Sequence, residues 1–415
     1  MIVYQALIRL FGKGRFSAFD DKALEHLKSL GVSHLWLTGV IRHSSGKPYV
    51  KGQIGSPYSI SDYYDVNPYL ADCPEQRMEE FLALVQRAHD KGLKVLLDFI
   101  PNHVSPDYSD PFGRIPTLGI HDYDWTDTDK IDYGQESTEE RMLDILRFWA
   151  AKGIDGFRCD MAELVSLDIW SRMLGSIRSE YPELLFIAEV YEKNNYSAFV
   201  HRAGFDYLYD KSGLYDIIRG IYAGKNNCRD ISFNWQWLGS IQGNMLNFLE
   251  NHDEQRLASP YFAGNPEKGY AALALSCLFY PTAFMLYFGQ EIGEDAHDGH
   301  EGRTSIFDKA RHIRPCSRLD AAHRNMLRTY QYVLQLKRKL EGRSNFDLCY
   351  CQSAQNGWNS EKHFAFLRGE RCLVACNFSD EPATIRLHIP HTANSVIPNG
   401  TEITIMPWNF TIIEK

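Results

Sequence analysis

The 415-residue sequence lacks several features that would place a protein in a class at once. It contains neither a Cys-x-x-Cys pair nor a Cys/His cluster, and its nine cysteines are scattered, which argues against a disulfide framework and a zinc site. It has no internal repeat, low-complexity tract or transmembrane run. It also lacks a basic N-terminal region followed by a long apolar segment, so we expect a cytoplasmic protein with reduced thiols.

Positive charge is also in short supply. Lys and Arg total 44 against 53 Asp and Glu, which gives a net charge of -9, and no basic run is interleaved with aromatic residues. We therefore expect neither nucleic acid nor an anionic membrane as a partner. A hydrophobic content of 44% is typical of a globular protein, and the 13% of aromatic residues can fill a core or stack on neutral sugars. The composition leaves the oligomeric state open.

What the sequence does contain is a set of apolar runs that end in polar residues. In the stretch 153–160 (GIDGFRCD), Arg158 and Asp160 are two residues apart on an expected strand, so they point to the same side. A neighbouring cation keeps an acid ionised and lowers its pKa. For an isolated Arg-x-Asp, the ordinary explanation is a structural ion pair.

Three further runs change that interpretation. Acids, amides or histidines end the stretches LLDFIPNH (96–103), FIAEV (186–190) and FLENHD (248–253). A (β/α)8 barrel builds its active site at the carboxyl ends of its strands in this way. Taken in this order, the four stretches resemble the four sequence motifs of the α-amylase family, glycoside hydrolase family thirteen, and the resemblance extends from about Val3 to Lys415.

This resemblance implies an α/β fold: a (β/α)8 TIM barrel with a short inserted domain B and a C-terminal antiparallel β domain. The expected segments are 1–103 for the first part of the barrel, 104–137 for domain B, 138–342 for the second part of the barrel, and 343–415 for a β-sandwich, domain C.

Hydrophobic periodicity supports this order of elements. The connection from Gly39 to Pro74 is too long for an ordinary barrel loop. After Gly342 the pattern changes to short alternating strands. Barrel strands are predicted at 2–9, 33–38, 93–99, in the run that ends at Asp160, and at 184–188, 205–209, 244–249 and 283–288, with helices at 20–30, 75–91, 138–151, 166–180 and 320–340.

The resemblance also implies roles for three acids: Asp160 as nucleophile, Glu189 as general acid and base, and Asp253 as the acid that stabilises the transition state. The residues next to Asp160 and Glu189 are consistent with these two different roles. Arg158 keeps Asp160 ionised, whereas the apolar run before Glu189 suits a raised pKa.

Further residues are implied around the sugar. Tyr58 would stack under it, although an aromatic ring is also a common core residue. Asp98 and Asn102 would orient the site, and Arg303 and Asp298 either reach an outer sugar or form surface ion pairs. The implied substrate-binding set is Tyr58, His103, Arg158 and His252.

The function implied is retaining hydrolysis of α-1,4-glucosidic bonds in starch, glycogen or maltodextrins. A maltogenic or α-1,6-acting glucosidase and a glucan transglycosylase are alternatives in the same family, because acceptor choice depends on loops. The short domain B and the lack of an added N-terminal β domain favour a plain amylase arrangement. A catalytically inactive carbohydrate-binding or scaffold barrel is the remote alternative, but the chain keeps all three acids.

We expect no cofactor and no metal. Calcium-dependent members of the family bind the ion with the motif asparagine, acids of domain B and a histidine four residues past the nucleophile. Here Asn102 is present, but Leu164 occupies the histidine position and Lys130 stands where an aspartate is expected. Calcium takes six to eight oxygen ligands, and a lysine repels it.

Overall fold

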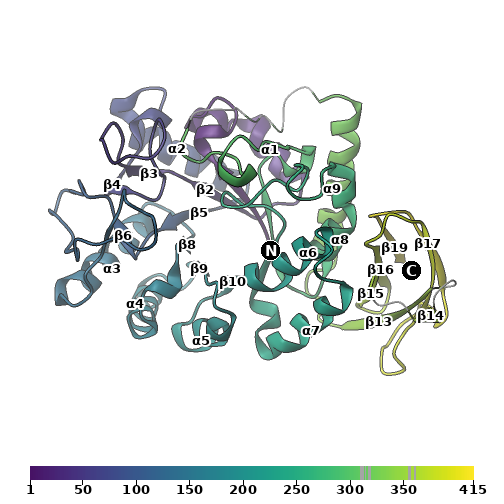
Figure 1. The fold of residues 1–415 in the computed structure, drawn as a ribbon. Helices are drawn as coiled ribbons and strands as arrows, with labels where there is room; N and C mark the ends of the chain where they lie inside the picture. Colours follow the sequence, from purple (N-terminus) through teal and green to yellow (C-terminus); the bar gives the residue numbers. More distant parts are fainter. Residues whose placement is uncertain (309–312, 314, 316–318, 354–356, 359–360) are drawn as a thin grey trace. The chain divides into compact units, whose positions relative to one another are not determined.

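The computed structural model describes residues 1–308, 313, 315, 319–353, 357–358 and 361–415 (Figure 1). Eight strands close into a parallel barrel in the order β1-β12-β11-β10-β9-β8-β5-β2, which confirms the predicted fold class. Each predicted strand segment contains one of them: β1 (Ile2–Leu7), β2 (His34–Thr38), β5 (Lys94–Phe99), β8 (Gly156–Cys159), β9 (Leu185–Ala188), β10 (Tyr207–Tyr209), β11 (Met245–Phe248) and β12 (Ala283–Tyr287).

The helices follow the strands along the chain. Five of them match the predicted segments: α1 (Asp21–Ser29), α2 (Arg77–Asp90), α3 (Glu136–Ala151), α4 (Leu167–Glu180) and α9 (Ala321–Lys339). Four were not predicted: α5 (Tyr196–Ala198), α6 (Asp216–Tyr222), α7 (Cys228–Leu238) and α8 (Tyr270–Leu278). Within the part of the chain that the structure describes, no helix has the length and apolar character needed to span a membrane.

The chain forms two compact units. One contains Val3–Tyr209, and with it the strands from β2 to β10. The other contains Asp210–Thr304 and the C-terminal part of the chain.

Two small sheets lie in the first unit. The long connection after β2 folds into an antiparallel pair, β3 (Ile41–His43) with β4 (Ile60–Val66). In the segment after β5, β6 (His103–Val104) pairs antiparallel with β7 (Asp129–Lys130) and places His103 opposite Lys130. The boundaries predicted for the barrel, domain B and domain C remain predictions.

The C-terminal sheet is antiparallel and depends on one long strand, β13 (Phe346–Ser353). The first half of β13 pairs with β15 and its second half pairs with β17, so this strand belongs to both halves of the sheet. The remaining strands are β14 (Gly357–Trp358), β15 (His363–Arg368), β16 (Cys372–Asn377), β17 (Ala383–His388), β18 (Glu402–Ile405) and β19 (Phe410–Glu414).

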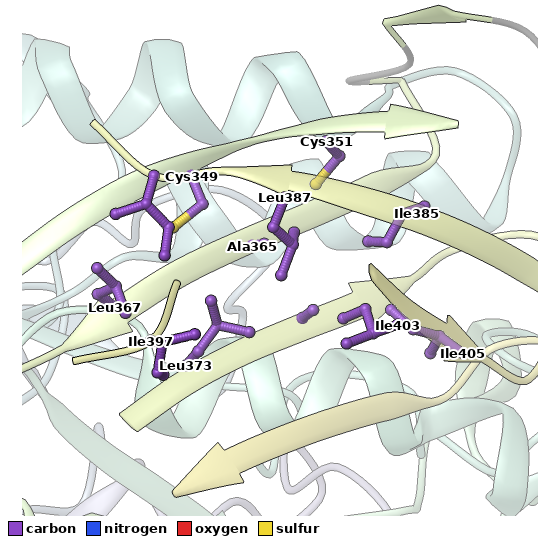
Figure 2. Close-up of a cluster of buried hydrophobic side chains, with 12 residues drawn as sticks. Cys349, Cys351, Ala365, Leu367, Leu373, Ile385, Leu387, Ile397, Ile403 and Ile405 are labelled. Atoms are coloured by element: carbon purple, nitrogen blue, oxygen red, sulfur yellow. The ribbon is translucent and has the colours of Figure 1, made fainter. Parts of the chain in front are cut away.

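The core of this sheet takes side chains from both halves (Figure 2). Leu373 on β16 and Leu387 on β17 are fully buried in it, and Cys349 and Cys351 on β13 lie in the same cluster. The eight cysteines among the described residues are all free thiols, so the close pair on β13 serves as small apolar side chains.

We predict that Leu373→Ala lowers the free energy of unfolding by about 2–5 kcal/mol, because it leaves a cavity in a core that cannot fully collapse. Leu373 is fully buried and lies opposite Leu367 on one neighbouring strand and Ile413 on the other. Denaturant unfolding followed by circular dichroism measures the change. The exposed Val396→Ala is the control, and equal stability of the two variants would contradict the assignment of this core.

Candidate active site

The backbone places Asp160 and Glu189 on neighbouring strands at the same end. Asp160 follows β8, and its N–H donates to the carbonyl of Phe99 at 2.8 Å. Glu189 follows β9, and its N–H donates to the carbonyl of Cys159 at 3.1 Å. The parallel hydrogen-bond ladder therefore continues one residue beyond the strands and fixes the backbone at both acids.

Gly156 lets β9 approach β8 closely. A Cβ atom at this position would lie only 2.3 Å from the carbonyl oxygen of Leu185. A larger residue would push the two strands apart, and Asp160 and Glu189 would separate with them. This close approach is the physical reason for the second glycine in the motif 153–160.

The side chain of Arg158 joins the acids. It has 0% of its side-chain surface exposed, and its Nη1 lies 2.6 Å from Oδ1 of Asp160, while its Nη2 lies 2.8 Å from Oε2 of Glu189. The same Nη1 lies 3.5 Å from Oδ1 of Asp98, the residue opposite Arg158 in the β5–β8 register. The expectation that Arg158 distinguishes Asp160 from Glu189 is therefore wrong, because the guanidinium has two terminal nitrogens and contacts both carboxylates.

Aromatic rings surround the rest of this guanidinium. Its Cζ lies 5.4 Å from the ring centroids of Trp36 and Tyr58, and 5.6 Å from that of Tyr209. The hydroxyl of Tyr209 also accepts a hydrogen bond from Nε at 3.3 Å. Burial acts to lower the pKa of Arg158, but neighbouring charges, Glu189 first among them, outweigh burial and raise it well above the usual value. Arg158 is thus a permanent cation.

Glu189 receives two more donors that the sequence analysis did not identify. The hydroxyl of Tyr191 donates to Oε1 at 2.8 Å, and the backbone N–H of Met161 donates to Oε2 at 2.9 Å. Met161 has a φ of 41°, a left-handed conformation that is uncommon for a non-glycine residue. Tyr191 could have been proposed from its position, two residues after Glu189, but its contact depends on the turn that follows β9.

Tyr58 and His103, both predicted to contact substrate, lie in the same unit. Tyr58 is 9% exposed, and its hydroxyl lies 3.5 Å from Oδ1 of Asp98. Burial lowers the pKa of His103 to about 4, so its imidazole is neutral at neutral pH. A neutral ring has one donor and one acceptor nitrogen, and either can form a hydrogen bond with a sugar hydroxyl.

Asn102, predicted to orient the site, binds the segment 104–137. Its Nδ2 donates to Oδ2 of Asp122 at 2.8 Å, and Nζ of Lys130 lies 2.9 Å from Oδ1 of the same carboxylate. Partial burial acts to raise the pKa of Asp122, but the bonds from Asn102 and Lys130 outweigh burial and lower it. This carboxylate is therefore ionised and held by two donors.

Asp253 and His252 lie in the other unit, in a loop held by a buried ion pair. Nη1 of Arg256 lies 3.0 Å from Oε2 of Glu250, and Oε1 of Glu250 accepts the N–H of Leu257 at 2.8 Å. Burial outweighs these partners and raises the pKa of Glu250 to about 7. Between the two anchors, Nε2 of His252 lies 3.0 Å from Oδ2 of Asp253, and Asp253 is partly exposed. The loop therefore presents a carboxylate beside an imidazole.

The two outer residues of the sequence analysis lie farther along this unit. Arg303 is half-buried and forms an ion pair at 3.0 Å with Glu301, whose side chain is exposed. This contact favours the surface ion pair over a sugar contact for Arg303.

Comparison with known proteins agrees with the four motifs. The model of the α-amylase catalytic domain matches residues 20–114 and 121–329. Alpha-amylase 3 of Dictyoglomus thermophilum is 24% identical over 337 residues, covering 70% of this chain and 64% of the relative. Neopullulanase 2 of Thermoactinomyces vulgaris is 22% identical over 406 residues, covering 89% of this chain and 63% of the relative. The chain thus spans just under two thirds of the length of these curated relatives.

Among solved structures, an α-amylase from Lactobacillus plantarum has a similar fold, with a TM-score of 0.76 and 22% identity, covering 100% of this chain and 98% of that chain. The fold likeness extends over the whole chain, and the catalytic-domain model matches most of it. The chain, with its four strand-end motifs in order, belongs to the α-amylase family.

Proposed function

We propose that this protein is a retaining glycoside hydrolase that cleaves α-1,4-glucosidic bonds in starch, glycogen or maltodextrins. The observation that supports this most directly is the contact of one guanidinium with both Asp160 and Glu189. Such a bridge requires two neighbouring carboxylates, which is the pair of acids that hydrolysis of a glycosidic bond uses, and the retaining mechanism follows from the family motifs.

In this mechanism Glu189 donates a proton to the departing glycosidic oxygen while Asp160 attacks the anomeric carbon and forms a glycosyl ester. Glu189, now a carboxylate, then removes a proton from water, and the resulting hydroxide attacks the same carbon and releases Asp160. Two displacements retain the configuration. Asp253 is the third acid, which binds ring hydroxyls and stabilises positive charge at the transition state.

The family motifs also give roles to the remaining residues. Arg158 was predicted to bind substrate, but its side chain has no exposed surface. We therefore propose that it acts indirectly, by holding the two carboxylates in position, and does not contact the sugar. Tyr58 and the neutral His103 contact the cleaved glucosyl unit, and His252 contributes beside Asp253. These assignments follow the family motifs residue by residue.

Linkage and chain-length preference are the finer part of the proposal. The likeness to a neopullulanase, beside that to an α-amylase, keeps a maltogenic or α-1,6-acting enzyme and a transglycosylase as the second candidates.

We propose the cytoplasm as the location, because the described cysteines are free thiols that suit a reducing compartment. The excess of acidic residues, with a net charge of -9, disfavours nucleic acid as a partner.

Replacement of the two central acids tests the proposal. We expect Asp160→Asn and Glu189→Gln each to lower kcat on a maltodextrin by about 10²-fold or more, because each removes a step of bond making or proton transfer. Asp168→Asn, which changes an exposed acid of an ion pair on the surface of α4, is the control and should retain activity.

The configuration of the anomer that is released first distinguishes a retaining mechanism from an inverting one. Proton NMR of early product should show the α-anomer. An initial β-anomer would overturn the retaining mechanism, and near-parental activity of Asp160→Asn would overturn the assignment of the nucleophile.

Tyr191→Phe should shift the pH dependence of kcat/KM. The hydroxyl of Tyr191 donates to ionised Glu189, so its removal destabilises the carboxylate and leaves the acid protonated to higher pH. We expect the alkaline limb to move upward by about one pH unit. Tyr181→Phe, at the end of α4, is the control. An unchanged alkaline limb in Tyr191→Phe would show that this hydrogen bond does not act on the general acid.

The family's interdomain calcium does not fit the residues found here. Lys130 stands where an aspartate ligand is expected, and its ammonium lies 2.9 Å from Asp122, so a cation of the protein already occupies this place. The side chain of Leu164 offers no ligand atom. Across the residues that the structure describes, no three His, Cys, Asp or Glu side chains converge to hold a metal ion.

We therefore predict that incubation with EDTA followed by desalting leaves both the activity and the melting temperature unchanged. Lys130→Met is the complementary variant. It should lower the melting temperature, because Asp122 loses its cationic partner, and added calcium should not restore the loss. A large fall in the melting temperature of the parent with EDTA, reversed by calcium, would contradict the prediction.

A further inference from the structure

Two aromatic rings extend from His103 toward the surface of the segment 104–137. The ring centroids of His103 and Trp125 are 5.2 Å apart, and those of Trp125 and Tyr123 are 4.9 Å apart. His103 is buried, Trp125 is half-buried, and Tyr123 is 67% exposed. The rings thus run from a predicted substrate residue to the solvent.

The backbone before the exposed ring is held firmly. Tyr123 has a φ of 51°, a left-handed conformation that persists only where the surroundings enforce it. The preceding residue, Asp122, is bound by Asn102 at 2.8 Å and by Lys130 at 2.9 Å. The side chain of residue 122 therefore points inward, and the next residue turns its ring outward.

The backbone after the ring is also tied down. Nζ of Lys51 donates to the carbonyl of Asp124 at 3.1 Å, and the hydroxyl of Ser59 donates to the carbonyl of Asp127 at 2.6 Å. Ser59 directly follows Tyr58, the predicted stacking residue. Polar contacts on both sides of Tyr123 thus hold the backbone that carries the exposed ring. The conformation of this backbone does not depend on burial of the ring itself.

The charges around the two rings indicate which kind of ligand could bind there. Two acids near the rings are matched by cations, Asp122 by Lys130 and Asp127 by Lys51 at 3.6 Å, and Asp124, between the two rings in the sequence, adds an exposed carboxylate. Both lysines are paired, so no strong positive field is left for a phosphate, and the exposed carboxylate of Asp124 disfavours an anion. An exposed aromatic ring beside a half-buried one and polar side chains suits a neutral ligand with apolar C–H faces and many hydroxyls, which describes a hexose.

We propose that Tyr123 and Trp125 form a stacking platform for a glucosyl unit of the same glucan chain, beyond the unit held at Asp160 and Glu189. This inference rests on the proposed function. It adds a binding site for longer substrates, so that affinity depends on chain length through these two rings.

Calorimetric titration of maltotriose and maltoheptaose into Asp160→Asn tests the platform without turnover. The comparison protein is the double variant Asp160→Asn/Tyr123→Asn. Asparagine removes the ring but tolerates the left-handed conformation, so the melting temperature should fall only slightly, through the lost contact with Trp125. We expect the Kd for maltoheptaose to rise by roughly three- to tenfold and that for maltotriose to change less than about twofold.

Phe112 is the matched control. It is an aromatic residue of the same segment with a similar exposure of 68%, but its ring packs on Tyr64 and Arg141. Phe112→Ala should leave both affinities unchanged, and Tyr123→Phe should keep the affinity for maltoheptaose.

An unchanged Kd for maltoheptaose in the Tyr123 variant, or an equal loss for both sugars, would overturn the platform. Turnover by the parent tests the proposed function separately. A parent that cleaves neither sugar but loses maltoheptaose binding in Tyr123→Asn would overturn the hydrolytic function and leave the platform in place.

Discussion

The buried guanidinium of Arg158 is the interaction on which the arrangement of acids depends. Two carboxylates that extend side by side from β8 and β9 repel each other, and removing them from water adds a desolvation cost. Arg158 lies 2.6 Å from Asp160 and 2.8 Å from Glu189, so one cation offsets both effects. Its three aromatic neighbours exclude water, which strengthens these contacts and keeps the guanidinium from turning away.

Pairing of a carboxylate with a cation or another donor also stabilises the loops that carry the other polar residues. In the segment 104–137, Lys130 and Asn102 bind Asp122, so this short stretch keeps a defined backbone. In the other unit, Arg256 and Glu250 close the loop that carries His252 and Asp253. In each case charged groups are paired within the protein, and residues near the pair remain available for a ligand.

Glu189 has further donors in addition to Arg158. Asp160 and Glu189 share Arg158, but Glu189 also accepts hydrogen bonds from Tyr191 and from the backbone of Met161. All of these donors favour the ionised form of Glu189. A sugar that displaced Tyr191 or drew Glu189 toward the glycosidic oxygen would make protonation easier, so binding and proton transfer would be linked through this hydrogen bond.

The sequence by itself determined the barrel strands and the acids at their ends, because a buried parallel strand is a short apolar run and a polar residue after it is conspicuous. Helix α8 was missed because it is buried all round and shows no polar face. Only the tertiary structure decided which acids Arg158 contacts, that Tyr191 binds Glu189, and that Trp125 lies between His103 and Tyr123. These are contacts between side chains on turns and separate strands, and local periodicity carries no information about how such turns aim their side chains.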